Sequence, residues 1–154
     1  MTKLPTPSYS PEGTLFLDAI LEICRLNGRL LAEEESLLQA FGLTSARWKV
    51  LGVLSRFAQS LTVPQISRRI GLSRQNIQRL VDVLEVDGLV EYQINPDHKR
   101  AKLVSVTPKG QQRYAAVRQV HIPWVNHCAE GFNAADLEKT LKIIRTLIGQ
   151  LGQK

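Results

Sequence analysis

The stretch "GLSRQNIQRLVDVL", residues 71–84, predicts a short helix with two unlike faces. One face is apolar at helical spacing, as expected of a helix that packs on a core: Ile77, Leu80, Val81 and Leu84. The other face carries guanidinium and amide groups: Arg74, Gln75, Asn76, Gln78 and Arg79. The chain contains no acidic residue from position 65 to position 81. Guanidinium and amide groups match the acceptors and donors of bases in the DNA major groove, so the polar face indicates DNA recognition.

The residues before this helix predict a second, shorter one. Thr62 and Gln65 have the spacing of a capping box, and Pro64 falls in the first turn, where a missing N–H costs little. Gly71 suits the left-handed position after a helix, and Ser73 suits the N-cap of the next. Two short helices joined by a few residues that include a glycine are typical of a helix-turn-helix.

The segment after Gly88 has the pattern of a β-hairpin. Residues 89–94 and 101–107 are rich in β-formers, and "NPDHKR" (95–100) supplies the turn between them. The tip and the strand after it carry positive charge that would suit a minor groove or its phosphates: His98, Lys99, Arg100 and Lys102. Taken alone, this tip is equally typical of a solubilising turn. Directly after a basic helix, it predicts a winged helix-turn-helix.

The two ends of the chain predict long amphipathic helices around this central part. Residues 1–13 contain three prolines and are expected to form a flexible arm, and residues 14–42 a helix of roughly 28 residues. Residues 43–107 form the predicted DNA-binding domain, and residues 108–154 two further helices, with Pro123 kinking or ending the first. The expected fold class is therefore mostly α with a small β-hairpin wing.

The composition limits the classes of function. The 154 residues have a formal net charge of +6, which favours a polyanionic partner. No apolar run is long enough to span a membrane, and the start has no apolar leader, so a cytoplasmic location is expected. The sequence contains no Gly-rich phosphate loop, nucleophile elbow or paired-carboxylate motif, so it does not predict an enzyme. It also predicts no cofactor.

Two segments resemble the MarR family of bacterial transcriptional regulators. They are "LTSARWKVLGVL" (43–54) and "LSRQNIQRLVDVLEVDGLVEYQINPDHKRAKLVSVTPKG" (72–110). The resemblance covers about residues 14–150. It implies a homodimer whose terminal helices interlock and whose two winged domains bind a pseudo-palindrome. It also implies a repressor released by a small phenolic or anionic ligand.

The resemblance assigns particular roles within the predicted DNA-binding surface. By that likeness Arg74, Gln75, Gln78 and Arg79 lie on the recognition helix, and Arg100 matches the wing arginine that enters the minor groove. The family commonly has an aspartate where this chain has His98. The complete set of residues expected to contact DNA is Thr62, Ser73, Arg74, Gln75, Asn76, Gln78, Arg79, His98, Lys99, Arg100 and Lys102.

Other residues suggest an effector or a sensor. Arg25 and Arg29 lie one helical turn apart and would attract an anionic effector, and Trp48 would line a pocket for an aromatic one. A branch of the MarR family senses organic peroxides through a cysteine, so Cys24, with Cys128, is a candidate redox site. A buried thiol that acts as a small hydrophobe is the commoner case.

Two further alternatives concern metal ions and protein partners. His121, His127 and Cys128 are close in sequence but lack metal-ligand spacing, so no metal site is predicted. A winged helix used for protein–protein contact is the rival from another class. Such modules usually lose the basic residues that this recognition helix keeps, and salt-dependent binding to duplex DNA would separate the two.

Overall fold

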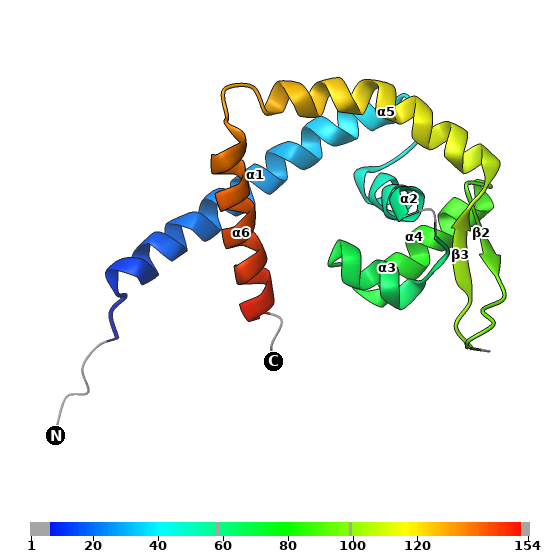
Figure 1. The fold of residues 1–154 in the computed structure, drawn as a ribbon, viewed down its shortest axis with the longest axis horizontal. Coiled ribbons are helices and arrows are strands. Elements are labelled where there is room, and N and C mark those ends of the chain that lie inside the picture. Colours follow the sequence, from blue (N-terminus) through cyan, green and yellow to red (C-terminus); the bar gives the residue numbers. More distant parts are fainter. Residues whose placement is uncertain (1–6, 58, 99, 152–154) are drawn as a thin grey trace. The chain divides into compact units, whose positions relative to one another are not determined.

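A computed structural model describes residues 7–57, 59–98 and 100–151 of the chain (Figure 1). The elements are α1 (Pro11–Gln39), α2 (Ser45–Phe57), β1 (Leu61–Thr62), α3 (Val63–Ile70), α4 (Arg74–Val86), β2 (Val90–Gln93), β3 (Leu103–Val106), α5 (Pro108–Cys128) and α6 (Ala134–Leu151). The chain divides into two compact units within α5, after Val117. No helix in the described ranges is long and apolar enough to cross a membrane. The winged helix-turn-helix lies in the first unit, and the mostly α fold class is confirmed.

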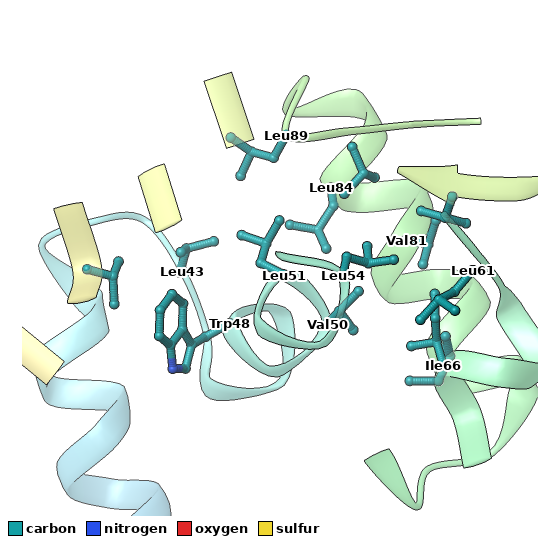
Figure 2. Packing of buried hydrophobic residues seen from close by; sticks show 14 of the residues in the cluster. Leu43, Trp48, Val50, Leu51, Leu54, Leu61, Ile66, Val81, Leu84 and Leu89 are labelled. Carbon is teal, nitrogen blue, oxygen red and sulfur yellow. The ribbon is translucent and has the colours of Figure 1, made fainter. Parts of the chain in front are cut away.

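The apolar face of α4 lies in the core, as predicted. Ile77, Val81 and Leu84 have no exposed surface, and Leu80 is partly buried at the edge. Figure 2 shows Leu84 pointing toward Leu51, on α2. Each fully buried aliphatic side chain stabilises the fold by about 1.5–3 kcal/mol. This burial fixes which side of α4 faces solvent.

The predicted caps of the helix-turn-helix are present. The backbone N–H of Thr62 donates to Gln65 Oε1 at 2.8 Å, which anchors the start of α3. Gly71 has φ +80°, a left-handed conformation that costs least without a Cβ. The Asn76 N–H donates to Ser73 Oγ at 3.2 Å and caps α4. The turn between α3 and α4 is therefore encoded locally.

The wing is a three-stranded antiparallel sheet in the order β1-β3-β2. The hairpin pairs Val90 with Val106 and Gln93 with Leu103, within the two segments that the sequence predicts. β1 was not predicted, because two residues cannot show an alternating pattern. Its pairing of Leu61 with Val104 joins the chain before α3 to the wing. The start of α3 and the wing are thus held side by side.

The first helix begins earlier than its sequence pattern predicts. α1 starts at Pro11 because Ser10 Oγ accepts the Gly13 N–H at 3.0 Å and proline suits the first helical position. The expected start at residue 14 and the expected arm of residues 1–13 are therefore wrong by three residues. The prolines suggested flexibility, but Pro11 marks a helix start.

The C-terminal end of α1 caps α2. The Ser45 N–H donates to Glu35 Oε1 at 2.9 Å, and the Ser45 hydroxyl donates to the buried carboxylate of Glu34. Lys49 Nζ lies 3.4 Å from the Glu34 carboxylate. Negative charge at a helix N-terminus is favourable because the backbone N–H groups there carry partial positive charge. The acidic run 33–35 therefore joins α1 to the winged domain.

The last two helices differ in one respect from expectation. Pro123 lies inside α5, which continues to Cys128, so the proline does not end the helix. α6 begins after Asn133, whose Oδ1 accepts the Asp136 N–H at 2.9 Å. None of the residues of α6, all of which the structure describes, is buried. A long amphipathic helix without a buried face has apolar surface left to cover.

A test of the packing between the wing and α5 uses Gly110. A Cβ there would collide with the Leu89 carbonyl oxygen and lie 2.7 Å from Val106 Cγ1. We expect Gly110→Ala to lower the free energy of unfolding by about 1–3 kcal/mol or more. Gly52→Ala is the control, because the added Cβ would make only an ordinary contact with Tyr114 Cε2 at 3.8 Å. The higher helix propensity of alanine should raise the free energy of unfolding of this variant by about 0.5–1 kcal/mol. Urea unfolding measures both, and equal stabilities would contradict the packing described.

Candidate nucleic-acid interface

A groove of about 700 Å³ lies between the start of α3, the exposed side of α4 and the wing. It is lined by Thr62, Val63, Pro64, Arg74, Gln75, Gln78, Asp82, Tyr92, Arg100, Ala101 and Lys102. Three of these residues carry positive charge and one, Asp82, carries negative charge. The lining comes from segments as far apart in sequence as residues 62 and 102. The groove is therefore a property of the fold and not of one helix.

Six of the residues predicted to contact DNA meet in this groove: Thr62, Arg74, Gln75, Gln78, Arg100 and Lys102. Ser73, Asn76, Arg79 and His98 are exposed but do not line it. Ser73 acts as the cap of α4, and the His98 carbonyl accepts the Ala101 N–H at 3.2 Å within the wing turn. Lys99 lies outside the described residues. The part each residue plays in DNA contact stays a prediction.

The N-terminal end of α4 adds electrostatic attraction for anions. Its first turn has no acidic residue, and Arg74 and Gln75 are exposed there. The first N–H groups of a helix have no intrahelical acceptor and carry partial positive charge, so they favour a phosphate nearby. The guanidinium of Arg74 adds a full charge at the same end.

A hydrogen-bonded triad that the sequence did not predict lies on the wall of the groove. Gln78 Nε2 donates to Asp82 Oδ1 at 2.8 Å and to the Tyr92 hydroxyl at 2.6 Å. The Tyr92 hydroxyl donates to the same Asp82 oxygen at 2.8 Å. Gln78 and Asp82 are one turn apart on α4, whereas Tyr92 lies on β2. The i, i+4 spacing of Gln78 and Asp82 could have suggested the first of these contacts.

Tyr92 is held in its protonated form. Burial, followed by the hydrogen bond to Asp82 and the charge of that carboxylate, raises the pKa of Tyr92 to about 12. Lys102 Nζ lies 5.4 Å from the centre of the Tyr92 ring, within the range of a cation–π contact. Tyr92 therefore links the wing to α4.

The residues proposed for an effector lie in different settings. Trp48 is buried, and its ring stacks on that of Tyr114 with centroids 4.8 Å apart, so it fills the core. Arg25 pairs with Glu22 at 2.8 Å on the surface of α1, and Arg29 is exposed on the same helix. The structure brings no anion site together from these three residues, and their role stays a prediction.

Both thiols are exposed, in contrast to the buried setting expected as the commoner case. Cys24 lies on α1 and Cys128 is the last residue of α5. Exposure is compatible with a redox role but does not establish one. Within the part of the chain that the structure describes, no three His, Cys, Asp or Glu side chains could together hold a metal ion.

The chain matches one family model, and it matches several known bacterial proteins over most of its length. A sequence model described as "MarR family" matches residues 41–101. An uncharacterized protein of Mycobacterium tuberculosis is 35% identical over 129 residues, which cover 84% of this chain and 89% of that protein. The transcriptional activatory protein BadR of Rhodopseudomonas palustris is 29% identical, with 74% of this chain and 67% of BadR covered.

A solved structure supports the same fold. The crystal structure of CouR from Rhodococcus jostii RHA1, bound to p-coumaroyl-CoA, superposes with a TM-score of 0.77. The match covers 84% of this chain and 91% of CouR at 22% identity. At 22% identity, this similarity shows a shared fold and nothing further.

The triad predicts an unusual tyrosine titration. We expect one tyrosine of the folded protein to ionise near pH 12 and this step to be absent in Tyr92→Phe, as followed by tyrosinate absorbance. The raised pKa also means that its contribution to stability is complete below pH 10 and is lost as pH rises toward 12, because the unfolded chain ionises first. An unchanged titration in the variant would contradict the assignment.

Proposed function

The chain belongs to the MarR family of transcriptional regulators, and on this premise we propose that it acts as a homodimer on a pseudo-palindromic operator and responds to a small ligand. The observation that carries the proposal is the groove in which Arg74, Arg100 and Lys102 face one space. This arrangement places cations from a helix and from a hairpin where one duplex can meet both. A cytoplasmic location, as predicted from the sequence, is part of this proposal.

In the proposed complex, α4 lies in the major groove and the wing lies along the neighbouring minor groove. Arg74 and Gln75, at the exposed N-terminal end of α4, contact phosphates or base edges. Arg100 and Lys102 bring positive charge from the hairpin, and a narrow minor groove attracts such charge. Phosphate contacts supply affinity, and base contacts from α4 supply sequence preference.

The rival function, a winged helix that contacts only proteins, is less well supported. A protein-contact surface at this position would not require three cations around a groove with a single carboxylate. The rival predicts no binding to duplex DNA, whereas the proposed function predicts binding that weakens steeply as salt rises.

The homodimer is supported by apolar surface on the terminal helices. α6 carries exposed apolar side chains at spacings of three and four residues, which form one stripe: Leu137, Leu141, Ile144, Ile148 and Leu151. The N-terminal half of α1 likewise exposes Leu15, Phe16, Leu17, Ile20 and Leu21. Contiguous apolar surface of this kind marks an interaction site. We propose that a second copy of the chain covers it.

A two-fold dimer presents α4 twice, and this has a consequence for the operator. The two recognition helices then read half-sites related by inversion, spaced by one helical turn or a multiple of it, about 10 base pairs. The operator is therefore expected to be a pseudo-palindrome.

The ligand response is supported by the fold relationship to CouR, which was crystallised with p-coumaroyl-CoA. We propose a small aromatic or anionic effector, without assigning its site. Repression is the outcome that the family resemblance predicts, although BadR, a relative, is named an activator. Redox control through exposed Cys24 is the second candidate for the signal.

The DNA-binding proposal is tested by removing single charges. Against a duplex selected from a random library by the unaltered protein, Arg74→Ala and Arg100→Ala should weaken binding and lower the salt slope by about one each. Arg56→Ala removes an exposed charge outside the groove and serves as the control. Fluorescence anisotropy across a salt series measures all four proteins. Equal effects of the three substitutions would count against the groove as the DNA site.

The dimer is tested on α6. Ile148→Asp places a charge within the apolar stripe, where the side chain is 66% exposed in the single chain, so folding should survive. We expect a loss of about 3–5 kcal/mol in dimer stability, because an unpaired charge would be buried in the interface. Thr146→Asp adds the same charge on the opposite side of the helix and should stay dimeric. Light scattering after size exclusion would refute the interface if both variants had the mass of the unaltered protein.

A further inference from the structure

Gln78 is the residue of α4 whose hydrogen-bonding groups are most constrained by the protein itself. A free glutamine reads adenine with two hydrogen bonds, accepting from N6 and donating to N7. In this chain Nε2 donates to Asp82 Oδ1, at 2.8 Å, and to the Tyr92 hydroxyl, at 2.6 Å. The side chain then has one polar atom that the triad does not use, Oε1.

The chemistry of the partners decides the orientation of the amide. An ionised carboxylate only accepts, so Asp82 requires that Nε2 and not Oε1 face it. The Tyr92 hydroxyl donates its single hydrogen to Asp82 and therefore accepts from Gln78. Rotating the amide by half a turn would set Gln78 Oε1 against the Asp82 carboxylate oxygen, where neither atom carries a hydrogen.

The triad is also held in place from both sides. Gln78 and Asp82 are fixed one turn apart on α4, whose adjoining apolar face is fully buried at Ile77 and Val81. Tyr92 is fixed in β2 by pairing with Val104 of β3. Because the pKa of Tyr92 is raised to about 12, its hydroxyl keeps the hydrogen that it donates at physiological pH.

We propose that Gln78 contacts DNA as a hydrogen-bond acceptor only, through Oε1, and so selects a base that offers an amino group in the major groove. Adenine N6 and cytosine N4 are such groups, whereas guanine and thymine present acceptors there. Asp82 and Tyr92 are positioning residues that set this preference without touching the base. The inference rests on the proposed function, in which α4 enters the major groove.

The test determines the base preference of several variants by selection from random duplexes, followed by affinities for duplexes that differ at one base pair. The position read by Gln78 is the one whose preference is lost in Gln78→Ala. In the unaltered protein one strand should accept adenine and cytosine at this position with similar affinity, each favoured by about 5- to 10-fold over the same base pair reversed. Every base pair carries one amino group in the major groove, and reversing the pair moves that group to the other strand.

Two substitutions at Asp82 form a matched pair. Both Asp82→Ala and Asp82→Asn remove the negative charge from the groove, but only asparagine keeps an acceptor for Gln78 and Tyr92. We expect Asp82→Asn to retain the preference and Asp82→Ala to lose most of it, while the two gain similarly in overall affinity. Tyr92→Phe should lose part of the preference. In a Gln78→Ala background, Asp82→Ala should have no further effect at that position.

The outcomes separate the two proposals. If the unaltered protein selects a sequence but its Gln78-dependent position accepts a single base pair, or accepts adenine and guanine on the same strand, the inference is overturned and the proposed function stands. The same holds if Gln78→Ala changes no position, or if Asp82→Ala and Asp82→Asn behave alike. If the unaltered protein selects no sequence and binds no duplex at low salt, the proposed function fails, and the inference fails with it.

Discussion

Burial of one face of α4 is the constraint on which the rest of the molecule depends. Ile77, Val81 and Leu84 are fully buried, and with about 100° of rotation per residue they leave the helix no choice of outward face. The residues on that outward face are cationic or amide-bearing at its N-terminal end. If the core did not fix the rotation of α4 about its axis, the polar side chains of α4 would have no defined direction. The surface of the groove is thus a consequence of how the core is packed.

The wing is joined to α4 by polar contacts rather than by the core alone. Tyr92 accepts from Gln78 and donates to Asp82, and Lys102 lies over its ring. β1 adds a second connection, since its pairing with β3 brings the start of α3 to the same sheet. Three segments that are remote in sequence therefore form one charged surface. At the other end of the domain, the buried carboxylate of Glu34 accepts a hydrogen bond from the Ser45 hydroxyl at the start of α2. This contact attaches α1 to the winged domain that carries α4.

Much of this arrangement could be predicted because its signals are local. The cap at Ser73, the left-handed Gly71 and the change to a β pattern after Gly88 each depend on a few adjacent residues, and all three are present. The features that were missed are not local. β1 is too short for a pattern, and the partner of Asp82 lies 10 residues away on a strand. Pro11 was assigned to a flexible arm because proline suits both irregular chain and the first helical turn. The hydrogen bond from the Gly13 N–H to Ser10 Oγ identifies it as the helix start.

The central claim is that duplex DNA occupies the groove between α4 and the wing. Its most direct measurement is a nuclear magnetic resonance titration of the ¹⁵N-labelled protein with a selected duplex, followed through the backbone and side-chain amides. The account predicts that the largest shifts occur at Arg74, Gln75 and Gln78 and around Arg100 to Lys102, with small shifts along the exposed side of α6. Largest shifts on α6, or uniform small shifts throughout the chain, would contradict it.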